Sequence, residues 1–454
     1  MLIRTPLIIA AVAGLSSGIG GSASAADCTT RKPDTASGKK YIQIGDAWAG
    51  TRIRFPVVQS GGKYFVGYFD EDRWLTVAEY DPANGRICRT RTQSRFSGWD
   101  KHNVITLTFD RDKHIHVTGN MHNSSLVYAT TTVPNSVDGL KLQAMTGQEG
   151  NRITYPHFIT SPSGRLLFMY RAGGSGNGAW WVNEYQNGKW TRLTKQPIFA
   201  DSYENKPVSA YPVMSEPTAD GKFHFAIVWR RSPNVATNFR LSYASTRDFN
   251  NWEFYGKPPV SGSISPDNAQ TIDDVGSNGG LTNMPMITID NGRPLVAYVK
   301  KAAPSEDGIY LATPTAKGWK TQLSVKGPSP NALKGAGSLA RDEATRIMDV
   351  DVASRTVKAS FANHVTRAAS FAGAPASAAR AAPTGAKARE RLKLFKIPPG
   401  LLKPSVIVEP SDQSSAFIQY FAQDANRDRA PACDAKTPMA CKPPASPLYL
   451  VLPD

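Results

Sequence analysis

The sequence predicts an all-β fold, and three observations support this prediction. Short runs rich in Val, Ile, Tyr, Phe and Thr recur from Ile42 to about Val365, separated by Gly, Asn, Asp and Pro. Almost no stretch has the apolar spacing of an amphipathic helix. A loose internal repeat places a Trp after a strand and a glycine-bearing turn, as in Tyr185–Trp190 and Thr313–Trp319. Repeats of about forty to fifty residues favour a β-propeller, in which four-stranded blades surround a central channel.

The expected strands follow one another along the chain. In a further unit, Ser245, Asp248 and Trp252 resemble a degenerate Asp-box, the turn found on sialidase-like propeller blades. The tryptophans of these units are expected to pack in blade cores. The last strand is expected to pair with N-terminal strands, the usual closure of a propeller ring. The predicted strands are Lys63–Phe69, Leu75–Tyr80, Val104–Phe109, Ile115–Thr118, Leu126–Thr130, Arg165–Tyr170, Trp180–Tyr185, Phe223–Trp229, Leu241–Ala244, Met286–Ile289, Leu295–Val299, Tyr310–Ala312, Leu392–Ile397, Ser405–Glu409, Ala416–Phe421 and Leu448–Leu452.

Residues 1–26 have the pattern of a secretory signal peptide. Arg4 precedes a short apolar run, and small residues end the segment at Ala25-Ala26. The run is too short for a membrane-spanning helix, and no later segment approaches the ~18 apolar residues that such a helix needs. We therefore expect an exported protein, secreted or periplasmic, whose residues 27–454 form a single β-propeller domain without a membrane segment.

Two features are expected to elaborate this domain. Residues 367–390 are rich in Ala, Arg, Pro and Gly and hold few residues able to form a core, which indicates a surface insertion. The four cysteines fit an oxidising compartment but are too few for a disulfide scaffold. Cys433 and Cys441 lie in a C-terminal loop at about 423–446 that they are placed to close, which leaves Cys28 and Cys88 as the other pair.

The charge balance favours a polyanionic partner. The formal net charge is +16 and the pI about 9.6, and a basic surface attracts polyanions through long-range steering. Nucleic acid and acidic polysaccharide both fit this charge, and the expected export favours the polysaccharide. We expect a monomer that binds an anionic polysaccharide and binds neither nucleic acid nor a membrane.

The segment from Trp99 to His122 holds two strand-like runs, 104–109 and 114–118, joined by a charged turn. His102 precedes the first run, and His122 follows the second. An antiparallel hairpin brings the start of its first strand beside the end of its second. We therefore expect the two histidines at one end of this hairpin, within side-chain reach of a common point.

The next two units repeat this arrangement. Tyr155 stands before the strand pair of one unit, and Arg171 ends its second strand. Tyr211-Pro212 and Arg230-Arg231 hold the corresponding positions in the following unit. The same antiparallel geometry places the polar side chains of all three units on one face of the propeller, around the mouth of the channel.

Histidine, tyrosine and arginine without a carboxylate pair indicate uronate β-elimination, because glycoside hydrolysis normally needs two carboxyl groups. An arginine, or a histidine that donates a hydrogen bond, neutralises the uronate carboxylate and stabilises the developing enolate-like charge. A His or Tyr removes the C5 proton, and a second such group protonates the leaving oxygen. A tyrosine needs a lowered pKa for this work, and we expect Arg171 to lower the pKa of Tyr155.

The chain carries the motifs WDKHNVITLTFDRD, IHVTGNMH, TYPHF, LLFMYRAGGSGNG, VWRRSPNVATNFRLSYA and STRDFNNW. With them, the region from Trp48 to about Tyr298 resembles the BNR-repeat propeller family that contains ulvan lyases and rhamnosyl-glucuronate lyases. The resemblance implies a seven-bladed propeller. It also implies a secreted polysaccharide lyase that cleaves rhamnosyl-glucuronate linkages of an acidic polysaccharide, such as ulvan or an arabinogalactan gum, by β-elimination.

The resemblance also implies roles for single residues. His102 and Tyr155 are the expected base and acid, in an order that the sequence leaves open. Arg171 and His122 are expected at the uronate carboxylate. The residues expected to bind substrate are Arg230, Asn103 and Asn177.

Two alternatives stay open beside the lyase. A related branch of the family, the α-L-rhamnosidases, uses a His in a W-x-G-H segment on the opposite face, where this chain has Thr51 after Trp48-Ala49-Gly50. Threonine cannot transfer protons as histidine does near neutral pH, so this departure disfavours a hydrolase. The second alternative is a non-catalytic glycan-binding propeller. No cofactor is expected for the chemistry, and no ligand cluster indicates a metal, although the family leaves room for a structural calcium or zinc.

Overall fold

The computed structural model describes residues 26–36, 38–148, 150–327, 333–336, 345–361, 366–371, 397–411, 414–423, 428–436 and 438–453. Within these ranges the regular secondary structure is almost entirely strand, and the one helix is the short 3-10 helix η1, Val235–Thr237. The predicted all-β class is therefore confirmed. No helix in the described ranges is long and apolar enough to cross a membrane.

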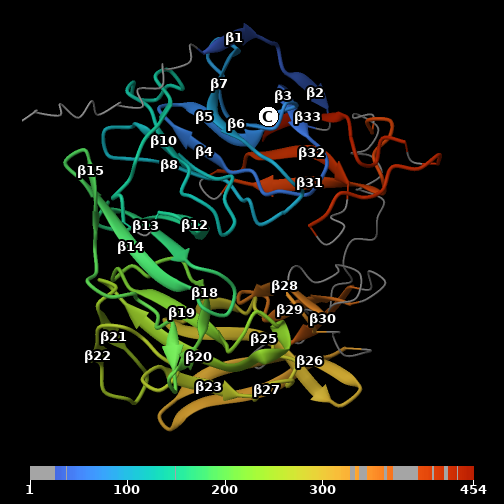
Figure 1. The fold of residues 1–454 in the computed structure, drawn as a ribbon. Helices are drawn as coiled ribbons and strands as arrows, with labels where there is room; N and C mark the ends of the chain where they lie inside the picture. Colours follow the sequence, from blue (N-terminus) through green and yellow to red (C-terminus); the bar gives the residue numbers. More distant parts are fainter. Residues whose placement is uncertain are drawn as a thin grey trace, which may run out of the picture.

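The first half of the chain forms three antiparallel sheets, and apart from one N-terminal strand in the first sheet, each is built from strands that follow one another in sequence (Figure 1). The first has the order β1 (Asp27–Thr30), β7 (Arg86–Arg95), β6 (Trp74–Asp81), β5 (Lys63–Phe69) and β4 (Val57–Ser60). The second has the order β11 (Lys141–Leu142), β10 (Tyr128–Thr130), β9 (Ile115–Thr118) and β8 (Thr106–Phe109). The third has the order β12 (Ile153–Thr160), β13 (Leu166–Ala172), β14 (Ala179–Gln186) and β15 (Lys189–Arg192).

The second half continues in the same way after a small hairpin of β16 (Ser202–Tyr203) and β17 (Lys206–Pro207). The fourth sheet has the order β18 (Ser209–Met214), β19 (Phe223–Arg230), β20 (Asn238–Thr246), β21 (Asn251–Glu253) and β22 (Val260–Ser261), and β23 (Gln270–Asp274) also pairs with β20. The fifth has the order β24 (Met286–Asp290), β25 (Arg293–Ala303), β26 (Glu306–Thr315) and β27 (Gly318–Lys326). The sixth has the order β28 (Arg346–Asp351), β29 (Thr356–Ser360) and β30 (Thr366–Ser370).

The two ends of the described chain meet in one sheet, as predicted. Its order is β2 (Asp34–Ala36), β3 (Lys39–Trp48), β33 (Ala445–Pro453), β32 (Phe417–Gln423) and β31 (Pro404–Pro410). Leu450 on β33 lies opposite Ile42 on β3, and Figure 1 shows the blue and red strands side by side. The described ranges thus hold seven sheets of three or more strands, and seven blades stays the prediction for the whole ring.

Apolar side chains fill the spaces between neighbouring sheets. One cluster joins the sheet that holds both ends of the chain to the first and second sheets, through residues such as Ile42, Phe65 and Ile115. A second cluster joins the third and fourth sheets and includes Trp180 and Trp229. Because sheets that share a core cannot slide against each other without exposing it, the side chains at the ends of neighbouring strands are held at fixed relative positions.

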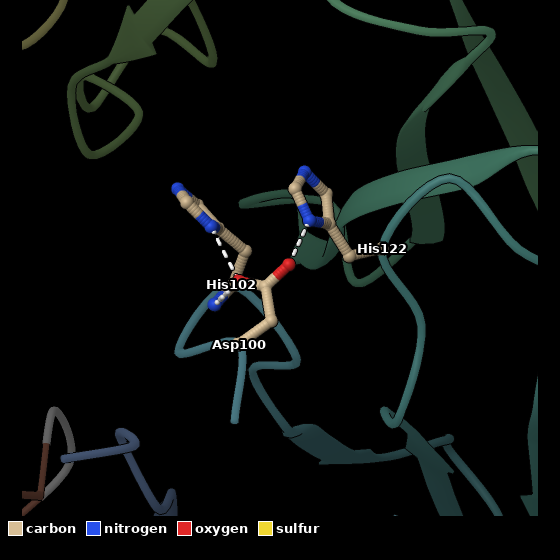
Figure 2. Close-up of side chains that lie close together, drawn as sticks. All are labelled: Asp100, His102 and His122. Atoms are coloured by element: carbon tan, nitrogen blue, oxygen red, sulfur yellow. Dashed lines mark hydrogen bonds and ion pairs between the residues drawn. The ribbon is translucent and has the colours of Figure 1, made fainter. Parts of the chain in front are cut away.

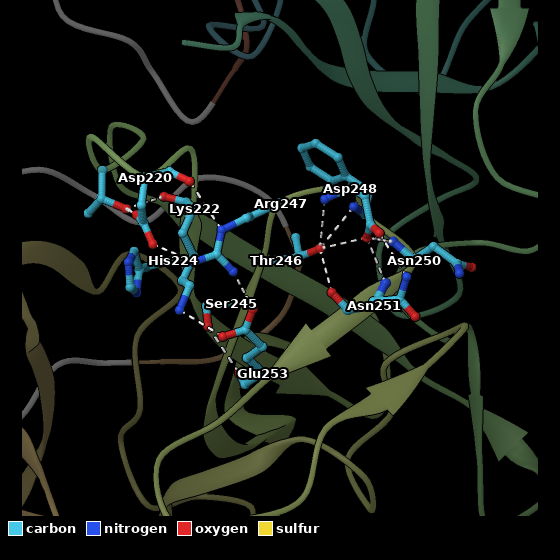
Figure 3. Close-up of polar contacts among 12 residues, drawn as sticks. Asp220, Lys222, His224, Ser245, Thr246, Arg247, Asp248, Asn250, Asn251 and Glu253 are labelled. Atoms are coloured by element: carbon cyan, nitrogen blue, oxygen red, sulfur yellow. Dashed lines mark hydrogen bonds and ion pairs between the residues drawn. The ribbon is translucent and has the colours of Figure 1, made fainter. Parts of the chain in front are cut away.

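The Asp-box turn forms on the fourth sheet, but its hydroxyl comes from Thr246 and not from Ser245 (Figure 3). The Thr246 hydroxyl donates to the carbonyl of Asn251 at 2.7 Å, and Asp248 accepts the backbone N–H of Asn251, also at 2.7 Å. The hydroxyl of Ser245 instead donates to a backbone carbonyl of β21 at 3.1 Å. Trp252 is fully buried, which confirms that this tryptophan packs in a blade core.

One end of the sheets collects the loops that matter for function, and we call it the site end. In the second, third and fourth sheets the first strand begins opposite the end of the second, as the hairpin argument required. The loop before β8, the loop after β9 and the loops after β13 and β19 therefore all leave at the site end.

The segment from Trp48 to Thr51 also lies at the site end and not on the opposite face. The Trp48 ring packs edge-on against Trp99, with ring centroids 5.2 Å apart, and Trp99 belongs to the loop that leads into β8. The rhamnosidase branch led us to expect this segment on the face opposite the site. This expectation is wrong for this chain, because the loop after β3 leaves its sheet at the same end as the loop after β7.

Several further expectations concern covalent links and chain boundaries. The disulfides Cys28–Cys88 and Cys433–Cys441 are both present. The start of the insertion expected at 367–390 was placed too early, because residues 367–370 belong to β30. Residues 372–390 lie outside the described ranges. Residues 1–25 of the expected signal peptide and 392–396 of the strand expected at Leu392–Ile397 also lie outside them.

Candidate active site at one end of the sheets

Asp100 joins the two histidines of the second sheet (Figure 2). Its Oδ1 lies 2.6 Å from Nδ1 of His102, and its Oδ2 is hydrogen-bonded to Nδ1 of His122. The two imidazole rings stack with centroids 4.5 Å apart. The prediction that both histidines reach a common point is confirmed, but Asp100 was not predicted as part of the site, although it stands two residues before His102 in the same motif.

Asp100 is held in its ionised form. Burial would raise the pKa of this carboxyl, but hydrogen bonds from His102 and His122 together hold it well below its usual range. A carboxylate can only accept hydrogen bonds, so both imidazoles carry a hydrogen on Nδ1. In the neutral form of each ring the lone pair then lies on Nε2, the nitrogen that is free to accept a proton. This tautomer is assigned from the hydrogen-bond network.

Tyr155 lies beside the histidines in an unusual backbone conformation. Its φ is 57°, in the left-handed region that bulky residues rarely adopt, and it sits where the register of β12 shifts between Thr154 and His157. Its ring meets His102 edge-on at 6.3 Å and stacks on Trp180 at 6.0 Å. Strained conformations of this kind persist where the surrounding structure enforces them, and they cluster at functional sites.

Arg171 is a buried cation beside this tyrosine. Only 1% of its surface is exposed, and its Cζ lies 4.7 Å from the centroid of the Tyr155 ring. Its Nε and Nη1 have no hydrogen-bond partner in the described part of the chain. Gly178 makes room for it, because a Cβ there would come within 2.5 Å of the Arg171 Cδ. A buried and incompletely paired guanidinium is costly, and an anionic ligand would supply the partner it lacks.

The expected lowering of the Tyr155 pKa is wrong. Burial of the phenol raises the pKa of Tyr155, and the nearby guanidinium of Arg171 opposes this rise without reversing it. The reason lies in the packing of the ring among Trp180, Tyr211 and Arg171, which removes water from a group that would have to become an anion. Near neutral pH the phenol keeps its proton, so Tyr155 can give a proton away.

Arg230 extends the site onto the fourth sheet. Its guanidinium donates to the Tyr211 hydroxyl and the Ser175 hydroxyl, each at 3.0 Å, and to Asn238 at 2.8 Å and Asn283 at 2.5 Å. Its Cζ also lies 4.2 Å from the Tyr211 ring centroid. Burial lowers the pKa of Arg230, though not enough to discharge a guanidinium.

None of the four polar partners of Arg230 was predicted as a site residue. Tyr211, Ser175 and Asn238 stand in or beside segments that the sequence analysis singled out. Asn283 lies outside them. Such partners are found only when the fold has brought the loops of three sheets together.

The two predicted asparagines do not join the cluster of imidazoles, phenol and guanidinium. Asn103 is buried, and its side-chain amide donates to the backbone carbonyl of Asp100 at 2.9 Å, which closes the turn that carries the carboxylate. Asn177 is exposed and accepts the backbone N–H of Gly174 at 3.2 Å. It borders a neighbouring cavity instead.

Two groups of side chains in the described ranges offer three metal ligands each. One is Asp100 with His102 and His122, and the other is Asp110, Asp112 and His114. The first group is the one already joined by hydrogen bonds at the site end. The second lies around the turn between β8 and β9, at the opposite end of the sheets. That the chemistry needs no cofactor stays a prediction.

The fold and the site define a β-propeller that presents two imidazoles, a protonated phenol and two buried guanidinium groups at one end. Residues 63–325, over half of the chain, match the model of a family described as BNR repeat-containing family member. The chain belongs to this BNR-repeat family.

Curated relatives match over a short stretch. A segment of 72 residues is 40% identical to the short isoform of ulvan lyase from Alteromonas sp. (strain LOR) and covers 14% of this chain and 14% of that protein. A segment of 73 residues is 36% identical to the long isoform from Glaciecola sp. (strain KUL10) and covers 14% of this chain and 7% of that protein. The chain thus matches only a small part of the length of these relatives.

A solved structure matches over nearly the whole chain. The fold is similar to the crystal structure of polysaccharide lyase Uly1, with a TM-score of 0.52 and 15% sequence identity, and the similarity covers 93% of this chain and 94% of the other. At this level of identity the likeness bears on the fold, and it agrees with the propeller architecture.

Proposed function

We propose that the protein is a polysaccharide lyase that cleaves the rhamnosyl-glucuronate linkages of an acidic polysaccharide such as ulvan by β-elimination. The observation that carries the proposal is Arg171, a buried guanidinium beside a protonated phenol and two imidazoles, with two nitrogens that have no partner in the described part of the chain. The ulvan lyases among the partial relatives support the same substrate class. The sequence pattern of residues 1–26 supports an exported enzyme.

The reaction begins with charge neutralisation. The positive charge of Arg171 offsets that of the uronate carboxylate, and His122 donates to the carboxylate, which lowers the cost of removing the C5 proton. A base takes that proton, and the electron pair left at C5 forms a double bond to C4. The bond from C4 to the glycosidic oxygen breaks, and an acid protonates the departing oxygen. No water enters the products.

We base the assignment of the acid and the base on the ionisation of the phenol. Since burial raises the Tyr155 pKa, Tyr155 is the proton donor to the departing oxygen. His102, whose ring meets Tyr155 edge-on, is the base, and its Nε2 carries the free lone pair. A histidine base works near neutral pH, where general acid–base groups of this kind contribute about 10²–10⁴-fold each.

Asp100 acts through the histidines as a positioning residue. By accepting a hydrogen bond from each Nδ1, it fixes the tautomer in which the lone pair of each neutral ring lies on Nε2, and it holds the two rings in place. A single substitution at Asp100 should therefore disturb the base and the carboxylate contact together.

The rhamnosidase alternative gains no support. Thr51 stands where that branch has its histidine, and a threonine hydroxyl has no pKa suited to proton transfer near neutral pH. A non-catalytic glycan-binding propeller would not explain why the buried Arg171 is incompletely paired or why the backbone of Tyr155 is strained.

An absorbance assay tests the proposal. Purified protein is incubated without added metal over a panel of ulvan, arabinogalactan gum and other uronate polysaccharides. A lyase gives an unsaturated uronate that absorbs in the ultraviolet. New reducing ends without this absorbance, or free rhamnose, would show that the protein is a hydrolase; binding without any product would show a glycan-binding propeller.

A further inference from the structure

A cavity of about 620 Å³ lies beside the cluster of catalytic candidates, between the second and third sheets. This volume is within the range of about 300–1,000 Å³ that holds small ligands. Its wall includes Ala172, which directly follows Arg171, and Asn177, which directly precedes the Gly178 that packs against Arg171. The cavity and the cluster therefore share one stretch of backbone. The polar side chains that line it include Gln143, Gln148, Asn151, Arg152, Asn177 and Asp201.

Arg152 stands between the cavity and the histidines. Its Nε donates to Oδ1 of Asn123 at 3.0 Å, and Asn123 directly follows His122. Its backbone carbonyl accepts the N–H of Gly173 at 2.8 Å. Gly174 lies close to the guanidinium, since a Cβ there would come within 3.0 Å of the Arg152 Nη2. The Arg152 side chain is thus held in place at its Nε, while the residue as a whole is exposed to solvent.

The lining suits a charged sugar. Arg152 is exposed and forms no ion pair with any acidic side chain in the described ranges, whereas Arg231 pairs with Glu204 and Arg240 with Asp274. Amide side chains of Gln143, Gln148 and Asn151 offer donors and acceptors for hydroxyl groups. Asp201 offers an acceptor, and the Trp181 side chain adds an apolar surface to the same wall. Few but well-placed polar groups beside an aromatic wall are typical of ligand sites.

We propose that this cavity is a second sugar-binding subsite, which holds a further anionic unit of the polysaccharide next to the unit that reacts. Arg152 pairs with the carboxylate or sulfate of that unit, and the amides bind its hydroxyl groups. The proposal rests on the proposed lyase function for the identity of the ligand. It adds that the enzyme recognises a stretch of polymer and not only the uronate at the cleaved bond.

The test compares Arg152→Ala and Arg152→Lys with a matched control, Arg111→Ala. Arg111 is also an exposed arginine, and its Nε donates to the carbonyl of Gly164 at 3.1 Å, but it lies in the turn between β8 and β9 at the opposite end of the sheets. Two measurements are made on each folded variant. One is retardation in a gel that contains ulvan, and the other is kcat and KM on ulvan and on the shortest oligosaccharide that the wild type cleaves.

We expect Arg152→Ala to raise KM on ulvan about ten- to a hundredfold, the loss that follows removal of a charged hydrogen bond. Its kcat and its activity on the shortest oligosaccharide should stay near those of the wild type, and its retardation in the gel should fall. Arg152→Lys should keep part of the affinity, because the charge remains while the fork of donors is lost. Arg111→Ala should behave as the wild type does.

The outcomes separate the two proposals. If the wild type cleaves ulvan and Arg152→Ala matches Arg111→Ala in both measurements, the subsite is wrong and the lyase stands. If no unsaturated product forms but Arg152→Ala alone loses retardation, the subsite stands and the lyase is wrong. A wild type that neither cleaves ulvan nor is retarded by it overturns both.

Discussion

The Cζ of Arg171 lies 4.7 Å from the ring centroid of Tyr155, and two of its nitrogens have no hydrogen-bond partner among the residues that the structure describes. A cation so close to a phenol favours the phenolate, yet burial has the larger effect and the pKa of Tyr155 rises. The pair therefore combines an unsatisfied positive charge with a neutral proton donor. A uronate unit bound here would meet its counter-charge and its acid at the same place.

Replacing Arg171 by Met should separate stability from activity. The variant keeps most of the side-chain volume and removes a buried charge that is only partly compensated, so the unfolding temperature should stay equal or rise. Activity on ulvan should fall at least about 10²–10³-fold, as for the loss of a group that stabilises transition-state charge. Thermal unfolding and kcat/KM on the same preparation provide the test. A marked fall in unfolding temperature would show that Arg171 is a structural residue.

Tyr155→Phe should remove the acid and leave the site assembled. The ring contacts with His102 and Trp180 do not need the hydroxyl, so binding of ulvan in a retardation gel should be unchanged. The value of kcat should fall about 10²–10⁴-fold, the contribution of one general acid. An unchanged kcat would contradict the assignment of Tyr155 as the proton donor to the departing oxygen.

Asp100→Asn should change the tautomer of the histidines. The Asn amide can donate to Nδ1, which would move the ring hydrogen of His102 or His122 to Nε2 and block the base. Where an aspartate fixes the tautomer of a catalytic histidine in this way, the amide variant loses about 10⁴-fold in kcat. Nitrogen NMR of the imidazoles reads the tautomer directly, independent of turnover. Spectra identical to those of the wild type would contradict the positioning role of Asp100.

His224 should make stability depend on pH, away from the site. Burial first, and then the charge of Lys222, lower the pKa of His224 from 6.5 to about 4; Figure 3 shows it beside Lys222 on the fourth sheet. Between these two values the unfolded chain binds a proton that the folded protein does not, so stability falls as pH falls from 6.5 towards 4, by at most about 1.4 kcal/mol per pH unit. His224→Gln should flatten this part of the curve. Denaturant unfolding at several pH values measures it, and identical slopes in both proteins would show that His224 is not responsible.

The sequence was informative wherever a short-range rule decides the geometry. Alternating residues and turns predicted the hairpins, and antiparallel pairing then predicted that His102 and His122 would meet. These inferences need only the direction of neighbouring strands. The same antiparallel argument predicted Tyr155, Arg171 and Arg230 at this end of the next two sheets, and the family resemblance added their roles. The usual closure of a propeller ring predicted that the last strand would pair with N-terminal strands, and it pairs with β3.

The sequence failed where burial and loop contacts decide. The packing that raises the pKa of Tyr155 comes from Trp180 and Tyr211 on two different sheets, which no local pattern shows. Asp100 was passed over because one acidic residue in a loop is usually solvated, and only the fold places it between the imidazoles. The hydroxyl of the Asp-box was assigned to Ser245 and not to Thr246, since both residues fit the loose pattern and only the turn geometry separates them.

The central claim is that the glycosidic bond is broken by elimination and not by hydrolysis. Digestion of ulvan in water enriched in heavy oxygen, followed by mass spectrometry of the fragments, tests it most directly. The account predicts unsaturated fragments that carry no label from the solvent, in an amount that falls with Tyr155→Phe. Fragments that carry heavy oxygen at their new reducing ends would contradict it.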